Sequence, residues 1–453
     1  MELIEKRETP FPLHYSIYNG IDMVEAVAKA TPKQLDAQDQ YGNTALHIAA
    51  MLNDNDSISR LLALGCRVDI RNNEGWRAVD EMISLKNRTM VTQAFLSYRD
   101  HILKEGTADK ISDKLLKMSD CALEFYWELK SWVPFISHFL PSDVCKLWKK
   151  GNKVRMDTSL LDFNNRSWVR GRLSILLDGS KPFDERICIL DHEKQCYEIM
   201  DGIMAKTNDN WLEQTIDMAT RNELVHMIVQ TEGMRCKTQS SKLIWNKDPV
   251  KERIGIFDTT LYTINNVKVI VKKRTEHLTK AEKRYNVMLK THLRHGALND
   301  ALKLAQSRKP GPPKDGPAER LTPRWTWAHY ESGLLCDTQL YIGKKPELKV
   351  QPRDIKLSVA MTDDVQLSPT HLIDLFQIFS PLRKFRRLRL SLAQGLPPGF
   401  PVRIEVPVMP SLIGRLVFTS IKDYGLPGQG QGEVPIPDEY FSIPDDYKTK
   451  DML

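Results

Sequence analysis

The sequence predicts an α+β protein of more than one domain, in which an all-α stack of short helical repeats precedes a mixed α+β domain rich in antiparallel strands. Two observations predict this fold class. The first hundred residues repeat with a period of 33, and beyond residue 150 apolar side chains begin to alternate with polar ones, a period of two that indicates strands. The chain has 453 residues, 41% hydrophobic and 27% charged. This composition is that of a globular protein, and the length suits roughly two to four domains.

The helical repeat is carried by matching stretches of sequence. "PLHYSIYNG" at 12–20 lies 33 residues before "ALHIAAMLN" at 45–53, and Gly42 lies 33 residues before Gly75. This period, with its Thr-x-Leu-His, Ala-Ala and Asp…Gly landmarks, resembles ankyrin repeats, with about three units in residues 1–100. The glycines suit the tight turns at the finger tips of such units.

The resemblance to ankyrin repeats implies a protein-binding surface at the tips and on the concave face. Thr44 and His47 can hydrogen-bond in the turn that opens a helix, so we interpret the histidines as structural. The tip residues expected to contact a partner are Tyr41, Asn43, Glu74 and Trp76. For Trp76, the alternative to a partner contact is packing against the next repeat unit.

The rest of the chain is expected to divide into three parts. Residues 101–150 form an aromatic-rich helical connector with a helix over 108–130, residues 151–425 form the mixed domain, and residues 426–453 form a flexible C-terminal tail. The remaining predictions are strands at 168–179, 185–191, 195–201, 347–361, 402–406 and 414–419, two strands over 253–274 about a turn at Asn265-Asn266, helices at 209–229, 279–308 and 368–382, and a Pro/Gly loop at 309–317.

One predicted strand is unusual because prolines surround it. "GLPPGFPVRIEVPVMP" at 395–410 alternates like a strand but contains five prolines. Proline cannot donate to a sheet ladder, so we expect an edge strand whose open side could pair with a partner protein. Phe400, Arg403 and Ile404 would then belong to a partner-binding surface. The alternative is that this strand pairs internally with "GRLVFTS" at 414–420.

Basic residues are concentrated in two segments. The net charge is +7, yet residues 268–309 alone contain 12 Lys and Arg against 3 acidic residues, and "RKFRRLR" at 383–389 adds five more. Such segments can contact an anionic membrane surface, although a solvated helix face is the alternative. The segment 268–309 contains one aromatic residue and the chain has no nucleic-acid-binding motif, so we expect no nucleic-acid partner. The candidate contacts are Lys272, Lys273, Arg274, Lys283, Arg284, Arg386 and Arg387.

No pattern in the sequence indicates an enzyme. We find no phosphate-binding loop, nucleophile elbow or metal-ligand spacing, so we predict no catalytic, cofactor-binding or metal-binding residues. The seven cysteines are scattered and odd in number, as in a chain with reduced thiols. The chain also has no apolar run of membrane-spanning length and no secretory signal, so we expect a cytoplasmic protein.

Long sequence blocks beyond the repeats resemble a known family. "MDTSLLDFNNRSWVRGRLSILLDG" from Met156, "KERIGIFDTTLYTINNVKVIVKKRTEHL" from Lys251 and "LPPGFPVRIEVPV" from Leu396 follow the N-terminal repeats in order. Together they resemble the ankyrin repeat domain-containing protein 13 family, whose second region is called the GPCR-chaperone domain. The stretch "SWVPFISHFLPSDVCKLWKKGNKVRMDTSLLDF" and the tail "FSIPDDYK" look most like its 13C branch.

The family resemblance implies a function. It implies a non-enzymatic chaperone or adaptor that binds G-protein-coupled or other multi-pass receptors and regulates their biogenesis and exit from the endoplasmic reticulum, on whose cytosolic face it would lie. Other branches carry ubiquitin-interacting motifs, which we do not find here, so ubiquitin binding is doubtful. A ubiquitin-linked endocytic adaptor at endosomes and a peripheral anionic-lipid-binding protein are the alternatives. The family implies no cofactor.

Overall fold

The computed structural model describes most of the chain. The described residues are 9–21, 27, 31–105, 108–131, 140–164, 167–182, 185–199, 209–240, 248–294, 298–307, 319–333, 341–370, 375, 396–409, 412–427 and 434–449. The predicted loop at 309–317, the aromatic stretch 132–139, most of the predicted helix 368–382, and Arg386 and Arg387 lie outside these residues.

The first hundred residues form a stack of helices. The first helices of successive repeats are α1 (Pro12–Asn19), α4 (Ala45–Met51) and α6 (Ala78–Ser84), and α4 contacts both of the others. Behind them lie α5 (Asn55–Ala63) and α7 (Arg88–Glu105), while the short α3 (Pro32–Leu35) precedes a finger tip.

The predicted landmarks explain where the helices of the stack begin. The Thr44 N–H donates to His47 Nδ1 (3.1 Å) at the start of α4, and His47 Nε2 contacts the Trp76 carbonyl oxygen (3.1 Å) in the next unit. Gly42 and Gly75 have φ values of +73° and +94°, which favour glycine at both tips. The histidines are therefore structural, as predicted, and the all-α N-terminal stack is confirmed.

A large sheet follows the helical stack. In the described residues it has 14 strands in the order β14-β6-β5-β4-β3-β2-β1-β13-β12-β11-β10-β7, with β8 and β9 also paired to β10. All pairs are antiparallel except β14 with β6. The strands are β1 (Asp120–Ser131), β2 (Ser142–Lys150), β3 (Lys153–Asn164), β4 (Ser167–Asp178), β5 (Ile187–Asp191), β6 (Cys196–Ile199), β7 (Leu224–Gln230), β8 (Arg235–Thr238), β9 (Lys251–Ile254), β10 (Phe257–Arg274), β11 (Leu348–Thr362), β12 (Phe400–Met409), β13 (Leu412–Gly425) and β14 (Lys448–Thr449).

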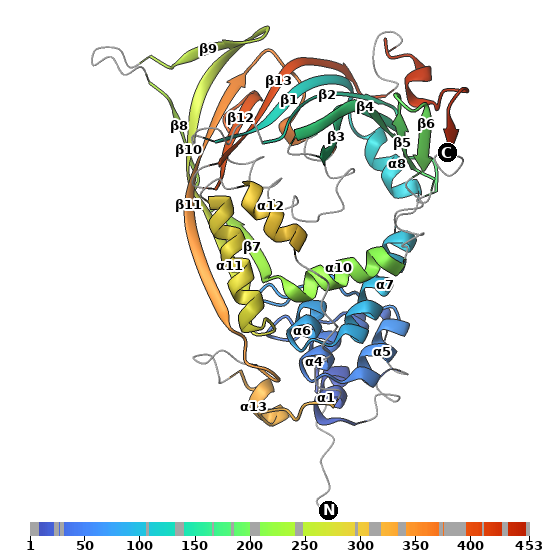
Figure 1. Ribbon diagram of the computed structural model, residues 1–453, viewed down its shortest axis with the longest axis vertical. Coiled ribbons are helices and arrows are strands. Elements are labelled where there is room, and N and C mark those ends of the chain that lie inside the picture. Colours follow the sequence, from blue (N-terminus) through green and yellow to red (C-terminus); the bar gives the residue numbers. More distant parts are fainter. Residues whose placement is uncertain are drawn as a thin grey trace, which may run out of the picture.

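The sheet and the helical stack meet along one side of the molecule. Figure 1 shows the middle strands arching over the top, while β10 and β11 run down to the helices at the bottom. The helices α11 and α12 lie beside β7, β10 and β11, and α10 crosses above α6 and α7. The remaining helical elements are α8 (Ala108–Leu116), α10 (Asp209–Arg221), α11 (Lys280–Arg294), α12 (Leu298–Ser307), α13 (Trp327–Glu331) and the 3-10 turn η2 (Asp438–Phe441). The α+β multidomain class is confirmed.

Several predicted helices are wrong in extent. The helix predicted over 108–130 ends at Leu116, and β1 begins at Asp120, because Cys121, Leu123 and Phe125 alternate inward toward the sheet core. The connector 101–150 is thus partly strand, since β2 also falls within it. Similarly, the helix predicted at 209–229 ends at Arg221, before β7.

The long β10 strand also departs from the prediction. The turn lies at Gly255, where φ is +60°, between β9 and β10. Asn265 and Asn266, which we predicted to form that turn, instead form an irregularity within β10, where the register with β11 shifts between Ile264 and Val267. Asn266 takes the left-handed conformation with φ of +63°. The helix predicted over 279–308 is divided into α11 and α12.

The proline-rich strand β12 lies inside the sheet, so the predicted edge position is wrong. It pairs with β11 through residues 400–405 and with β13 through residues 403–409. Pro401 lies where only β11 is paired and Pro407 where only β13 is paired, and each is beside a register shift. The staggered pairing thus lets an interior strand contain prolines. The alternative, internal pairing with 414–420, is confirmed.

The C-terminal segment contacts the sheet. The Tyr440 ring lies 5.4 Å from the Trp148 ring, and Tyr447 Oη contacts His192 Nδ1 (2.6 Å). Lys150 Nζ pairs with Asp438 at 2.9 Å. Residues 434–449 are therefore held against the sheet, contrary to the expected flexible tail.

Candidate functional site

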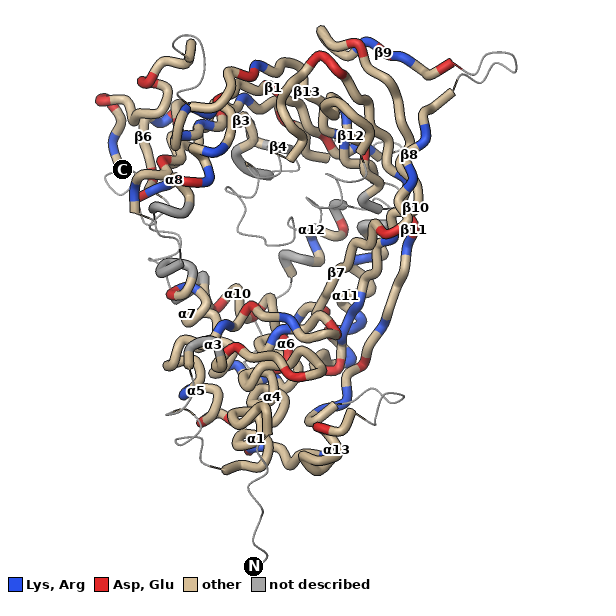
Figure 2. Tube along the Cα trace, turned by 180° about the vertical axis from the view of Figure 1, so that it is seen from behind, with Lys and Arg blue, Asp and Glu red and all other residues tan. Residues whose placement is uncertain are grey.

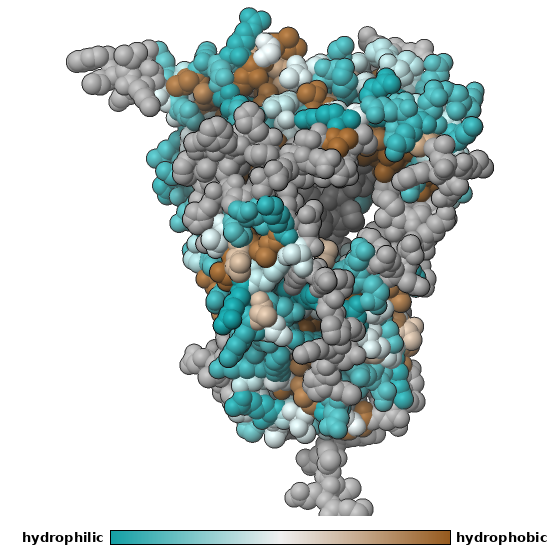
Figure 3. Space-filling model, in the orientation of Figure 1, coloured by the Kyte–Doolittle hydropathy of each residue, from teal (hydrophilic) through white to brown (hydrophobic). Residues whose placement is uncertain are grey.

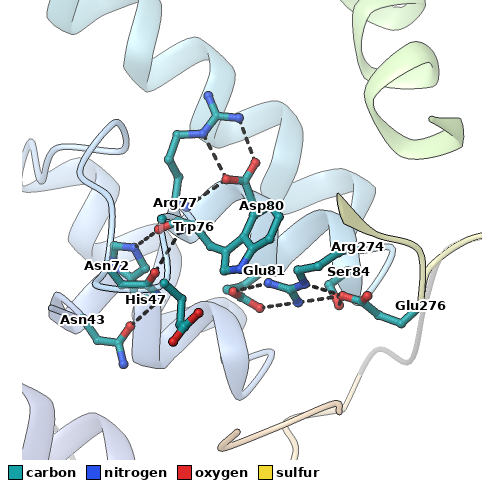
Figure 4. A network of polar contacts seen from close by, with 12 residues as sticks. Asn43, His47, Asn72, Trp76, Arg77, Asp80, Glu81, Ser84, Arg274 and Glu276 are labelled. Atoms are coloured by element: carbon teal, nitrogen blue, oxygen red, sulfur yellow. Dashed lines mark hydrogen bonds and ion pairs between the residues drawn. The ribbon is translucent and has the colours of Figure 1, made fainter. Parts of the chain in front are cut away.

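The junction between the ankyrin repeats and the sheet is built around Arg274, the last residue of β10. Its guanidinium contacts Glu81 of α6 at 2.5 and 2.9 Å and Glu276 at 2.6 Å. Only 3% of the Arg274 side chain is exposed. It lies 5.1 Å from the centre of the Trp76 ring, and Ser84 Oγ donates to Glu276 (2.7 Å), so both parts of the chain enclose the charge (Figure 4).

The electrostatics of this junction favour the charged forms. Burial alone would lower the pKa of Arg274, but the carboxylates of Glu81 and Glu276 outweigh it and raise that pKa. Burial alone would raise the pKa of Glu276, but Arg274 and the Ser84 hydroxyl hold it below its usual value. Arg274 and Glu276 therefore remain ionised, and the two hydrogen bonds from Arg274 to Glu81 fix α6 against the end of β10.

The second finger tip packs against the same end of the sheet. The Trp76 ring lies 6.1 Å from the His226 ring of β7, in an edge-to-face arrangement. Lys272 Nζ donates to the carbonyl and carboxylate oxygens of Glu74 at 3.0 and 2.9 Å. A Cβ atom at Gly75 would lie 2.2 Å from His226, so a side chain at this tip would clash with the strand.

The concave face of the ankyrin repeats is covered by residues 319–333 of the same chain, called here the covering segment. Arg320 donates to the carbonyl oxygens of Ile17 (2.7 Å) and Tyr18 (3.0 Å) at the end of α1, and to the Asp54 carboxylate (3.1 Å). The backbone N–H of Leu321 donates to the carbonyl oxygen of Leu52 (2.7 Å), the residue that follows α4.

Tyr330 anchors the other end of the covering segment. Its side chain is buried (1% exposed), and its hydroxyl donates to Asp39 Oδ2 (2.5 Å) and accepts from Asn43 Nδ2 (2.9 Å). Tyr41 Oη donates to the Tyr330 carbonyl oxygen (3.0 Å). The Trp327 ring lies 5.3 Å from the Tyr18 ring of α1. The finger tip and α1 thus hold this end of the covering segment against the ankyrin repeats.

A cavity of about 560 Å³ lies beside the covering segment. It is bounded by the tip residues Asn72 and Trp76, by Ser84 of α6, by Tyr330, and by residues 341–348 that lead into β11. The covering segment, the cavity and the Arg274 junction therefore form one continuous site on the concave face.

The predicted partner-binding residues do not form one exposed surface. Asn43 and Trp76 are buried (5% exposed each), because they contact Tyr330 and the sheet, so their expected exposure is wrong. Trp76 is buried by packing, but its ring lies against His226 of β7 and Arg274 of β10 instead of against the next repeat unit, which was the alternative. Tyr41 is half-buried against Tyr330 and Glu74 is paired with Lys272.

The three predicted residues of β12 also contact other parts of the same chain. Phe400 is fully buried, with its ring 5.3 Å from the Phe418 ring, so it offers no partner surface. Arg403 donates to both carboxylate oxygens of Glu252 (2.9 and 2.7 Å), and Ile404 is half-buried between neighbouring strands.

Most of the predicted anionic-surface contacts have acidic partners. Arg274 is buried, which contradicts a membrane contact. Lys273 pairs with Glu223 (3.5 Å), Lys283 pairs with Glu347, and Lys272 pairs with Glu74. Arg284 is exposed. Figure 2 shows basic and acidic positions interspersed along the chain, in keeping with this pairing.

The sequence interpretation missed the covering segment. Its "RWTWAHY" stretch at 324–330 places three aromatic side chains within seven residues. This density of aromatic residues was the available signal that it packs against another surface.

Some site types are absent from the described part of the chain. Across the ranges given above, no group of three or more His, Cys, Asp or Glu residues could hold a metal ion. No helix within those ranges combines the length and the apolar character needed to cross a membrane. The six cysteines located there are free thiols.

Comparisons with known proteins agree with this architecture. Residues 155–448 match the family model ANKRD13 C-terminal, and residues 2–92 match the model Ankyrin repeats (3 copies). The chain is 28% identical to ankyrin repeat domain-containing protein 13C-B of Xenopus laevis, across 98% of this chain and 83% of that protein. Human 13C is 26% identical (97% and 77%), and mouse 13B is 27% identical (91% and 68%). Ankyrin repeats are protein-binding modules, and the match to the C-terminal model spans more than half of the chain, so the chain belongs to the ANKRD13 family.

Proposed function

We propose that this protein is a non-enzymatic chaperone and adaptor that binds cytosolic segments of G-protein-coupled or other multi-pass receptors. It would act in the cytoplasm at the surface of the endoplasmic reticulum and regulate receptor biogenesis and exit. Membership of the ANKRD13 family and the protein-binding character of ankyrin repeats support a binding role.

The observation that carries the proposal is the exposed apolar surface at β7. This strand is one end of the sheet, and in the described residues it pairs with β10 alone. Val225 and Met227 share one face of β7 and are 52% and 46% exposed. Met218 of the preceding helix α10 is 64% exposed. An edge strand can add an extended client segment, and methionine adapts to varied apolar side chains.

Exposed apolar side chains also occur elsewhere, for example Val287 and Met288 of α11, which are 61% and 50% exposed. On the face shown in Figure 3, brown patches are small and separated by hydrophilic side chains. Ile256, at the turn between β9 and β10, is 67% exposed and supplies a comparison position away from β7. The property that we predicted for β12, an edge open to a partner, thus belongs to β7.

The test is capture of a newly synthesised multi-pass receptor by the tagged full chain in microsomes, with ubiquitination blocked. The variant Val225→Thr/Met227→Gln keeps side-chain volume but removes apolar surface, and we expect capture to fall about fivefold, for roughly 1 kcal/mol of lost burial. The matched control is Ile256→Thr, which should capture normally.

Each other outcome counts against part of the proposal. Equal capture by the folded β7 variant would exclude β7 as the client surface. No capture by the unmodified protein would contradict the receptor role. Capture that disappears when ubiquitination is blocked would favour the endocytic adaptor, and membrane association that disappears at high salt would favour the lipid-binding alternative.

A further inference from the structure

We infer that the concave face of the ankyrin repeats is a peptide-binding groove occupied by its own covering segment. The partner for this groove is a segment with an arginine and, ten residues further on, a tyrosine in a short helical turn like α13. The inference concerns a surface separate from β7. It therefore does not depend on which client β7 binds.

The groove binds the covering segment largely through main-chain atoms. Asn53 Nδ2 donates to the Glu319 carbonyl oxygen (3.1 Å), and Tyr18 Oη donates to that of Trp325 (2.8 Å). The Tyr330 carbonyl oxygen accepts from Tyr41 Oη (3.0 Å) and from Gln40 Nε2 (3.1 Å). Any segment with the same backbone path could accept these hydrogen bonds, so the groove can bind a peptide that is not part of this chain.

Two side chains of the covering segment define the partner's chemistry. Arg320 lies at the carboxyl end of α1, where helix carbonyl oxygens and Asp54 favour a cation. Tyr330 requires a hydroxyl, because Asp39 needs a donor and Asn43 an acceptor at the bottom of the groove. Phenylalanine would remove the donor to Asp39 Oδ2 and the acceptor for Asn43 Nδ2, so the site distinguishes tyrosine from phenylalanine. Asp39 Oδ1 would keep its hydrogen bonds from the backbone N–H groups of Tyr41 and Asn43.

The covering segment fills the groove incompletely. A cavity of about 560 Å³ that is partly open to solvent remains beside Tyr330. Its walls include the polar side chains of Asn72 and Ser84. The covering segment therefore leaves room beside Tyr330. A partner with a larger side chain next to its tyrosine would fill more of the space.

The tether makes the groove selective. A segment in the same chain acts at an effective concentration on the order of millimolar, so a free peptide of micromolar affinity competes poorly. The apparent affinity for a partner is reduced by the fraction of molecules in which the groove is open. Weakening the cis contacts should therefore increase binding of a peptide in trans.

The experiment uses the full chain and a labelled synthetic peptide of residues 319–333. The variant Arg320→Ala/Tyr330→Phe should bind the peptide at least about tenfold more tightly than the unmodified protein, because its own segment leaves the groove more often. Adding Asn43→Ala within the groove should abolish that gain. The matched control Arg403→Ala/Tyr440→Phe makes the same two kinds of substitution far from the groove. It should bind the peptide no better than the unmodified protein.

A second measurement avoids dependence on a variant that fails to fold. Hydrogen exchange of the unmodified chain, at millimolar unlabelled peptide, should accelerate at the backbone amides of residues 319–333 as the peptide displaces them. If the folded variant shows no gain in affinity, or if saturating peptide leaves exchange of the segment unchanged, the covering segment is a fixed part of the fold and the inference is wrong.

Discussion

Two buried ion pairs show that the same interaction serves different purposes in different parts of this molecule. Arg274 contacts Glu81, which lies 193 residues earlier in the chain, and so joins the ankyrin repeats to the sheet. Lys149 of β2 contacts Asp120 of β1 at 2.8 Å, across only 29 residues, within the sheet itself. Both cations are almost completely buried (3% and 0% of the side chain exposed).

The surroundings of the two pairs explain the difference. Lys149 Nζ also donates to the Met118 carbonyl oxygen (2.5 Å), and Asp120 accepts from the Gly151 N–H (2.8 Å), so this pair fixes the entry into β1 and the turn after β2. Arg274 instead fixes the orientation of one domain against the other. Buried ion pairs often add little net stability, but removing one partner leaves a charge that cannot be solvated. Position therefore decides what each substitution disrupts.

The largest effect is expected for Arg274→Met. Glu81 and Glu276 would remain close together and buried without a cation, which should cost about 4 kcal/mol of the free energy of unfolding. Because the pair lies between domains, we expect scanning calorimetry to show one transition for the unmodified chain and two for the variant. Trypsin should also cut between the two parts more rapidly. A loss below about 1 kcal/mol would mean that the junction does not depend on this charge.

A somewhat smaller effect is expected for Lys149→Met, which leaves the single carboxylate of Asp120 with the Gly151 N–H as a remaining donor. We expect a loss of about 3 kcal/mol in urea unfolding. In hydrogen exchange, amides of β1 and β2 should lose protection, while those of α4 in the ankyrin repeats should keep it. Equal loss of protection in α4 would show that this pair, like Arg274, couples the domains.

Acid should lower the stability of the ankyrin repeats. Burial lowers the pKa of His47 from 6.5 to about 4, against the opposing effects of the Trp76 carbonyl group and Asp80, and burial also lowers the pKa of His14. The unfolded chain therefore binds more protons than the folded chain below about pH 6.5, so stability falls as the pH falls toward 4. Between pH 7.5 and pH 5, protonation of His47 in the unfolded chain should lower the free energy of unfolding by about 2 kcal/mol.

Urea unfolding at both pH values measures this effect, with His47→Asn as the comparison. The variant should be less stable at pH 7.5 but lose less stability at pH 5. An unchanged pH dependence in the variant would assign the acid sensitivity to other groups.

The ankyrin repeats could be predicted from the sequence because their signals are local. Thr44 caps the helix that contains His47, and Gly42 and Gly75 form the tips, all within a few residues of the turns they define. The sheet was predicted less well. Whether β12 is interior depends on β11 and β13, and proline content alone indicated an edge. The end of α8 likewise depends on β1, which begins shortly after it and pairs with β13.

The site could not be predicted because its contacts are distant in sequence. Tyr330 meets Asp39 across 291 residues, and Lys272 meets Glu74 across 198. A count of basic residues along the chain treated Lys272 and Arg274 as free charges. Glu74 and Glu81, which pair with them, lie in the ankyrin repeats. A local pattern indicates what a residue can do, whereas its partner decides whether that capacity is available to another molecule.

The smallest effect is expected for Lys283→Met, which removes an ion pair of the opposite kind. Lys283 of α11 and Glu347 are 36% and 57% exposed in their side chains. Water can solvate Glu347 once its partner is lost, so the free energy of unfolding should change by less than about 0.5 kcal/mol. Urea unfolding beside Lys149→Met provides the test, because the same substitution is made at a buried and an exposed lysine. A loss at Lys283 as large as that at Lys149 would mean that burial does not determine the cost of breaking an ion pair here, and it would also weaken the interpretation of Arg274.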